Sequence, residues 1–183
     1  MIYPIVAYGS PVLKKKALPI NSDYPGLKDL IANMFETMYD SSGVGLAAPQ
    51  INLSIRLFVI DGEPFSDDEP SLANFKKVFI NAEMLEETGE PWAYEEGCLS
   101  IPRIRGDVDR PAIIRIRYQN EQFETFEETF SGIDARVIQH EYDHTEGILF
   151  LEYLKPVKKA MIRGRLENIR KGKVKVDYKM KFA

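Results

Sequence analysis

Ser131-Gly-Ile-Asp-Ala-Arg-Val-Ile-Gln-His-Glu-Tyr-Asp-His-Thr-Glu-Gly147 carries the clearest helical signals in the chain. Ser131 can cap a helix, and an acid three residues later, Asp134, resembles the second half of a capping box. Gly147 is a typical residue for the turn that follows a helix. We therefore predict a helix over 132–146, and both histidines of the chain lie within it.

The two histidines are four residues apart in Gln139-His-Glu-Tyr-Asp-His144. Residues at this spacing lie one above the other on a helix, so both imidazoles can bind one metal ion, with Glu141 beside it. This is a His-Glu-x-x-His pattern, in which the glutamate serves as the general base. The alternative is two ordinary surface or core histidines that match the pattern by chance.

A third ligand is needed, because a metal that activates water usually has three protein ligands and one open position. No histidine remains, and the single thiol is Cys98, in Glu95-Glu-Gly-Cys-Leu-Ser-Ile-Pro102. This segment predicts a glycine-preceded turn with an irregular backbone. A lone cysteine is more often a small buried hydrophobic residue than a ligand. On the residues alone, both roles of Cys98 stay open.

The segment Gly43-Val-Gly-Leu-Ala-Ala-Pro-Gln50 follows a predicted first helix. Its glycines permit close approach of the backbone, and it lacks the Lys and Ser/Thr of a phosphate-binding loop. Gln50 carries an uncharged amide donor that can hold a developing oxyanion beside a metal. The alternative is a glycine-rich turn that leads into the strand around Leu57.

Two further helices are expected on either side of these motifs. Apolar residues recur at helical spacing over 27–38, after Asp23 and Pro25, which suit a cap and a first turn. A later helix over 156–170 is weakened by Gly164 in its middle.

Strands are expected where apolar residues form short runs or alternate with polar ones. The acidic, proline-containing stretch 61–70 is expected to be an exposed loop. Strict alternation over 173–182 predicts a terminal strand with one buried face. Separated strands with two or three helices indicate one α+β domain over 1–183. The internal strands are predicted at 57–60, 78–80 and 114–118.

Composition narrows the class of protein. The chain of 183 residues has one cysteine, so no disulfide can form within it, and this favours a reducing compartment. Neither a signal peptide nor a membrane-spanning apolar segment is evident. With 24 basic and 28 acidic residues, the net charge of −4 gives no general attraction to nucleic acid. We expect a cytoplasmic protein without membrane or specific DNA partners.

Three segments resemble the three signature motifs of the peptide deformylase family: Gly43-Val-Gly-Leu-Ala-Ala-Pro-Gln50, Glu96-Gly-Cys-Leu-Ser100 and Gln139-His-Glu-Tyr-Asp-His144. They occur in the family's order with similar separations, and the similarity covers residues 3–154. The resemblance implies a hydrolase that removes the formyl group from the N-terminal formyl-methionine of new polypeptides and releases formate. The expected fold is α+β, with antiparallel β-sheets around a central metal-binding helix, an N-terminal helix and a C-terminal strand.

The resemblance also implies a divalent ion held by Cys98, His140 and His144, with water in the fourth position. Fe(II) is the usual ion in the family, and Zn, Ni or Co are also found. The ligands alone suggest zinc, which one thiolate and two imidazoles suit well. In the implied mechanism, metal-bound hydroxide attacks the formyl carbon, and Glu141 acts as general base and then as general acid.

The remaining implied roles concern the oxyanion, the substrate and the ligand loop. Gln50 and the backbone N–H of Leu99 would hold the tetrahedral oxyanion. Apolar side chains near the metal would take the methionine side chain, or they are ordinary core residues. Backbone groups at two positions would pair with the peptide as an added strand. The pocket candidates are Val44, Ile133 and Val137, the pairing candidates are Gly45 and Ile101, and a Glu96–Arg110 ion pair would steady the Cys98 loop.

The chain departs from the common family pattern in two places. The pair Thr145-Glu146 replaces the usual Leu-Asp or Leu-Asn after the second histidine, which affects the helix end and leaves the ligands unchanged. Many members end in a helix associated with ribosome docking, whereas this chain is expected to end in a strand. Residues 155–183 carry 11 Lys and Arg against 2 Asp and Glu. Transient ribosome contact through this basic tail is one hypothesis, and a solvated face that balances the acidic body is the other.

Two other functions compete with this interpretation. A zinc peptidase of the His-Glu-x-x-His type would use a downstream glutamate, Glu167, as its third ligand and would not need Cys98. A binding module with a structural metal would need four protein ligands, of which only three are found. Glu141 and Gln50 would also have no purpose in such a module.

Overall fold

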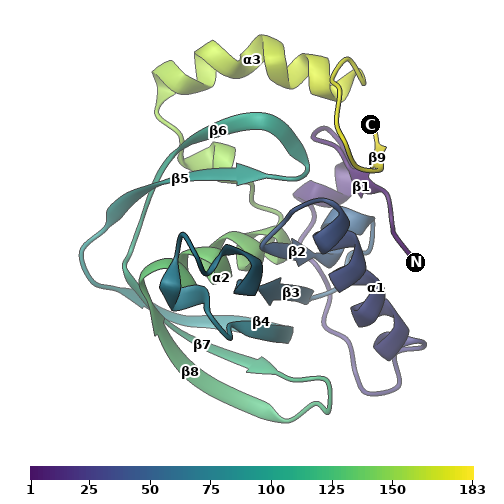
Figure 1. Cartoon of the computed structure of the whole chain (residues 1–183), viewed down its shortest axis with the longest axis vertical. Coiled ribbons are helices and arrows are strands. Elements are labelled where there is room, and N and C mark those ends of the chain that lie inside the picture. Colours follow the sequence, from purple (N-terminus) through teal and green to yellow (C-terminus); the bar gives the residue numbers. More distant parts are fainter.

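The computed structural model describes residues 1–183, with a five-stranded antiparallel sheet and the central helix α2 (Gly132–Glu146). In Figure 1, α2 lies between this sheet and a β-hairpin. The hairpin consists of β5 (Trp92–Cys98) and β6 (Ile101–Arg110). The sheet has the order β2 (Gly45–Ala47), β3 (Leu57–Asp61), β4 (Lys76–Thr88), β7 (Ile113–Gln119) and β8 (Thr125–Ser131).

The outer elements cover the sheet and the hairpin. Helix α1 (Leu27–Asp40) packs on β2 and β3, and α3 (Pro156–Arg170) packs on β6. The chain ends meet where β1 (Ile5–Val6) pairs in parallel with β9 (Met180–Lys181). Short 3₁₀ helices occupy Pro11–Lys14, Ala48–Ile51, Glu63–Phe65, Pro70–Leu72 and Phe150–Tyr153.

Strand β3 lies between two parts of the hydrophobic core. Leu57 and Val59 pack with α1 on one face of the sheet, whereas Phe58 and Ile60 pack with α2 on the other. All five residues of β3 are buried. A strand buried on both faces gives a continuous apolar run in the sequence, which explains the pattern over 57–60.

Both predicted helices are present and Ser131 is at the N-cap position of α2, but neither helix has the side-chain cap that the sequence predicts. Ser131 makes no capping hydrogen bond, because it is the last residue of β8 and pairs with Ile113 there. The Oδ1 atom of Asp134 is buried without a partner. Helix α1 begins after Gly26, which adopts a φ of 67°, and therefore Asp23 and Pro25 fall outside it. Gly147, with a φ of 75°, ends α2 as predicted.

The C-terminal strand is much shorter than predicted. Over 173–182 the side chains alternate between exposed and half-buried, as the sequence pattern predicts, but only Met180 and Lys181 form a strand. The reason is that β1, its partner, is itself two residues long and offers no more backbone for pairing. The predicted loop over 61–70 contains one short 3₁₀ helix, a second begins at its last residue, and Asp61 at its start is buried.

The sequence did not predict strands β1, β2, β5, β6 and β8. In β6 the inward positions include Gly106 and Arg110, so the alternation of burial is not an alternation of apolar residues. Strand β8 lies at the edge of the sheet and is largely exposed. The helix predicted over 156–170 is present, because Gly164 faces open space and Pro156 suits its first position.

None of the helices combines the length and the apolar character that crossing a bilayer requires.

We predict that Met34→Ala lowers the free energy of unfolding by about 2–5 kcal/mol, because Met34 is fully buried against the sheet and truncation leaves a cavity. The matched control is Met161→Ala in α3, where 72% of the residue is exposed and the expected change is within about 0.5 kcal/mol. Urea denaturation measures both. Equal effects of the two substitutions would contradict this description of the core.

Candidate active site

The only thiol and the only two imidazoles of the chain lie together. Cys98 ends β5, while His140 and His144 are one turn apart on α2. Their ligand atoms lie within 4.8 Å of one another, and Cys98 Sγ is 3.3 Å from His144 Nε2. Residues 46 positions apart in the sequence therefore converge because β5 runs alongside α2.

The donor set fits a divalent metal ion. One sulfur and two imidazole nitrogens at this separation suit Zn or Fe(II), and three protein ligands leave a coordination position open. His140 Nδ1 lies 2.8 Å from Glu96 Oε1, which leaves Nε2 as the nitrogen available to a metal. An imidazole oriented by a carboxylate in this way is the usual arrangement behind a metal ligand.

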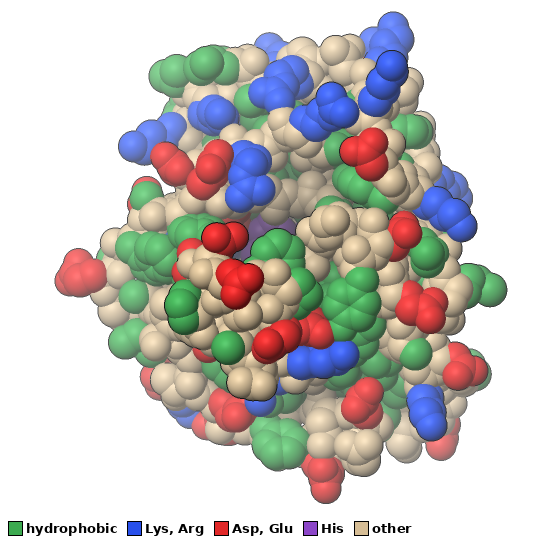
Figure 2. Space-filling model, viewed as in Figure 1, with side chains coloured by type: hydrophobic (Ala, Val, Ile, Leu, Met, Phe, Trp, Pro, Cys, Tyr) green, Lys and Arg blue, Asp and Glu red, His purple; other side chains and the backbone are tan.

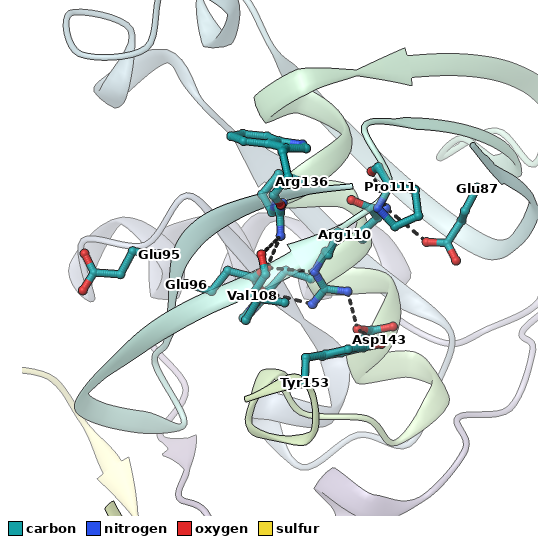
Figure 3. A network of polar contacts seen from close by, with 12 residues as sticks. Glu87, Glu95, Glu96, Val108, Arg110, Pro111, Arg136, Asp143 and Tyr153 are labelled. Atoms are coloured by element: carbon teal, nitrogen blue, oxygen red, sulfur yellow. Dashed lines mark hydrogen bonds and ion pairs between the residues drawn. The ribbon is translucent and has the colours of Figure 1, made fainter. Parts of the chain in front are cut away.

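Glu96 is the centre of a buried network of ion pairs (Figure 3). Arg110 donates two hydrogen bonds to the Glu96 carboxylate, at 2.8 and 3.1 Å, so this pair has the contact that the sequence predicts. Arg136 donates a further bond at 2.9 Å, and Asp143 accepts from Arg110 at 2.8 Å. Two guanidinium groups thus face two carboxylates, and the buried charges balance.

This network determines the ionisation of Glu96. Burial alone would raise its pKa, but hydrogen bonds from His140 and Arg110 outweigh burial and hold the pKa far below its usual value. The carboxylate therefore stays charged and keeps accepting from His140. Burial and the adjacent Asp143 carboxylate raise the pKa of Tyr153 to about 12, so its hydroxyl remains a donor to Asp143 at 2.9 Å.

The Glu141 side chain packs closely against strand β2. A Cβ atom added at Gly45 would be 2.6 Å from Glu141 Oε1, and so only glycine permits this approach. The other oxygen, Oε2, is buried with no hydrogen-bond partner. Burial raises the pKa of Glu141 to about 7. A carboxyl group with a pKa near neutrality can both accept and donate a proton.

Gln50 and Leu99 border the same space. The backbone N–H of Ala47 donates to Gln50 Oε1 at 2.9 Å, and this fixes the direction of the side-chain amide. Gln50 Nε2 consequently faces Cys98, 3.5 Å from Sγ. Leu99 lies in the turn between β5 and β6, and its carbonyl accepts a hydrogen bond from Tyr178 at 2.7 Å.

A cavity of about 480 Å³ opens beside the metal-ligand cluster. This volume is in the range of sites for small ligands and short peptide segments. Figure 2 shows a hollow on this face of the molecule, with a histidine visible inside it. Arg110 and His144 are the predicted site residues that do not line the cavity. Those that do are Val44, Gly45, Gln50, Glu96, Cys98, Leu99, Ile101, Ile133, Val137, His140 and Glu141.

Several residues at the site were not found from the sequence. Arg136 lies four positions before His140, and this spacing was a signal that it shares the helix face of the histidines. Phe65 reaches the cavity from the stretch 61–70 that was expected to be an exposed loop, and Leu72 reaches it from just beyond that stretch. Residues 175–178 of the tail line it as well, and no local pattern in the sequence indicates this contact.

Glu167, the third ligand in the alternative peptidase interpretation, is not part of the cluster. It lies in α3 and pairs with Arg170 at 2.7 Å and with Lys171 at 3.0 Å. Neighbouring cations hold its pKa at about 2 through hydrogen bonds with Arg170 and Lys171. The structure therefore does not support the alternative of a metal site completed by Glu167.

Comparison with known proteins identifies the family. The family model described as polypeptide deformylase matches residues 2–160. The peptide deformylase of Christiangramia forsetii is 57% identical over 189 residues, which cover 100% of this chain and 96% of that protein. The crystal structure of peptide deformylase from Thermus thermophilus has a TM-score of 0.83 and 41% identity, over 94% of this chain and 99% of that one. The crystal structure of peptide deformylase from Thermotoga maritima has a TM-score of 0.77 and 42% identity, over 85% of this chain and 99% of that one.

The chain belongs to the polypeptide deformylase family. It is accordingly a hydrolase of protein biosynthesis that removes the N-formyl group from nascent peptides, and the family implies a divalent metal ion.

We predict that Glu96→Gln lowers the free energy of unfolding by about 3–5 kcal/mol, because it leaves two buried guanidinium groups without their shared anion. Metal affinity is expected to fall about 10- to 100-fold through His140. Urea denaturation of the metal-free protein and a competitive metal titration measure the two effects.

The matched control is Glu95→Gln, one residue earlier, whose side chain is 60% exposed. Its effect on unfolding should stay within about 0.5 kcal/mol. A Glu96→Gln protein as stable as this control would contradict the role of the buried network.

Proposed function

We propose that Cys98, His140 and His144 hold one divalent ion, Fe(II) by resemblance to the family, and that the enzyme hydrolyses the formyl group of formyl-methionyl peptides at this centre. The observation that carries the proposal is the convergence of the chain's only thiol and both imidazoles at one wall of the cavity. When bound, such an ion would act as a Lewis acid and would lower the pKa of its bound water to near neutrality.

Glu141 moves the proton in this proposal. Its buried carboxylate takes a proton from the attacking water and then gives it to the leaving amine of methionine. Gly45 leaves room for that carboxylate against β2, and no basic side chain pairs with it. The carboxylate is therefore not held in an ion pair and stays available for transfer.

Gln50 and Leu99 stabilise the developing negative charge. The amide of Gln50 is oriented by Ala47 so that Nε2 points toward Cys98, where the formyl oxygen would lie. The backbone N–H of Leu99, in the turn after Cys98, is the second donor. Removing one donor of this kind typically costs about 3–4 kcal/mol in the transition state.

In this proposal the cavity binds the methionine side chain of the substrate. Val44, Ile133 and Val137 give it an apolar wall, and the last two lie on the helix face that carries His140. The peptide backbone pairs along Gly45 and Ile101, as an added strand. Both positions allow this, since β2 is at the edge of its sheet and β6 pairs with β5 alone.

We expect the anaerobically purified protein to contain one divalent ion per chain and to release formate from a formyl-Met tripeptide. Cys98→Ala should lose the ion and the activity together, whereas Glu167→Ala, in the ligand position of the rejected alternative, should keep both. Glu141→Gln should retain the ion and lower kcat by about 10²- to 10⁴-fold. Metal analysis and a formate assay measure these outcomes.

A metal-loaded protein that releases no formate from any formyl peptide would contradict the proposed function. Full metal content in Cys98→Ala would contradict the ligand set, whatever the activity.

Because the substrates are nascent chains, we also propose that the enzyme acts in the cytoplasm, near the ribosome.

Transient contact with the ribosome is proposed through the basic C-terminal region. Figure 2 shows Lys and Arg side chains spread over the part of the molecule where α3 runs in Figure 1. Lys155 and Arg163 are among the several exposed cations there that have no ion-pair partner. RNA phosphates would attract such a surface, and salt would weaken the attraction.

We predict that Lys155→Glu combined with Arg163→Glu abolishes cosedimentation with ribosomes at low salt and leaves formate release from short peptides unchanged. Lys28→Glu in α1, also an exposed cation, is the control and should still sediment. Equal sedimentation of all variants across a salt series would contradict ribosome contact through the basic C-terminal region.

A further inference from the structure

The C-terminal tail, defined here as residues 173–182, forms part of the cavity wall. Lys175, Val176, Asp177 and Tyr178 line the same cavity as Cys98 and Glu141. The family match ends at residue 160, before this segment begins. The part of the site that the tail builds therefore lies outside the residues that the family model matches, although the alignment with the Christiangramia forsetii protein covers the whole chain.

The tail is held at both ends, so its position is fixed. Near its start, the Lys173 N–H donates to the Asn168 carbonyl at 2.7 Å. Near its end, the N–H groups of Ile5 and Ala7 donate to the tail carbonyls of Lys179 and Lys181, at 2.9 and 2.8 Å. Alternate tail side chains pack against the core, namely Val174, Met180 and Phe182.

Tyr178 extends from this fixed tail to the turn that follows the metal ligand Cys98. Its hydroxyl donates to the carbonyl of Leu99 at 2.7 Å. The next carbonyl, that of Ser100, accepts the N–H of Tyr8 at 2.8 Å. In Figure 1 the arrow of β5, which ends at Cys98, points toward the side of the molecule where β1 and the tail lie.

Both carbonyls of the two-residue turn are thus held by groups outside the hairpin. When both carbonyls of the turn are fixed, the preceding peptide group, between Cys98 and Leu99, has little freedom to rotate. That peptide group carries the N–H of Leu99. Preorganised donors stabilise a transition state more than donors that must reorient during the reaction. The position of this N–H accordingly depends on the tail.

We propose that Tyr178 is a positioning residue for the reaction: its hydroxyl fixes the Leu99 turn so that the Leu99 N–H is aimed at the developing oxyanion. This inference rests on the proposed function, because it assigns the Leu99 N–H to the formyl oxygen. Tyr178 does not touch the reacting atoms in this account, and it acts only through Leu99. The tail then has a catalytic consequence beyond closing the cavity.

The test compares Tyr178→Phe with Tyr118→Phe in the full-length, metal-loaded chain. The control is Tyr118, a buried tyrosine whose hydroxyl donates to Glu128 in the sheet, away from the cavity lining, whereas Tyr178 is half-buried. Tyr178→Phe should lower kcat about 3- to 10-fold, the equivalent of one net hydrogen bond, and change KM less than about twofold. Metal content should stay equal in both variants.

Amide hydrogen exchange supplies a readout that does not depend on catalysis. We expect Tyr178→Phe to speed exchange at residues 96–102 and at the Tyr8 N–H, whose acceptor is Ser100. Tyr118→Phe should leave exchange in these segments as in the unsubstituted protein. Unchanged exchange, an unchanged kcat, or a rise in KM alone would overturn the proposal, since each shows that the hydroxyl does not hold the turn for the chemical step.

The two hypotheses fail in different ways. If neither the unsubstituted protein nor Tyr118→Phe releases formate, the proposed function is wrong. If both release formate at the same rate as Tyr178→Phe, the function stands and the role of Tyr178 is wrong.

Discussion

The buried carboxylate of Glu96 joins the three elements that build the site. It lies in β5, it accepts from Arg110 of β6, and it accepts from Arg136 and His140 of α2. Two residues further along β5 is Cys98, which faces His144 one turn further along α2. The hairpin is thereby held against the helix at two successive levels, first by ion pairs and then by the candidate metal ligands.

Such a network is not the most effective way to stabilise a protein. Apolar residues of similar volume often replace buried ion pairs with no loss of stability. Apolar packing would not, however, orient the His140 ring through Nδ1, nor keep a charged acceptor behind it. The balanced set of two guanidinium groups and two carboxylates lets this acceptor stay ionised in a site with almost no solvent contact. Stability and ligand orientation then depend on the same side chains.

Spacing in the sequence indicated only the part of the candidate site that lies on one helix, and the other candidate residues were named through resemblance to a family. The four-residue interval of His140 and His144 places both on one helix face without any tertiary information. Cys98 could be added only through resemblance to a family, since nothing local brings β5 to α2. Arg136 was missed although the same helical spacing links it to His140. The contact of Tyr178 with Leu99 joins positions 79 apart, and only the folded chain reveals it.

The fold class was predicted correctly, but several elements were not, for physical reasons. Strand β3 was recognised because both of its faces are apolar, whereas β6 directs Gly106 and Arg110 inward and so hides its period. In the tail, the alternation of polar and apolar residues correctly indicated which side chains face the core. The number of tail residues that pair as a strand, however, depended on the length of β1. The cap at Ser131 failed because a strand continues up to the first residue of the helix.

The central claim is that one sulfur and two imidazole nitrogens bind a single ion. X-ray absorption spectroscopy of the zinc-loaded protein measures this ligand set directly. We predict one sulfur at about 2.3 Å and two nitrogens at about 2.0–2.1 Å from the metal, with one lighter atom completing the shell. A spectrum without a sulfur neighbour would contradict this claim.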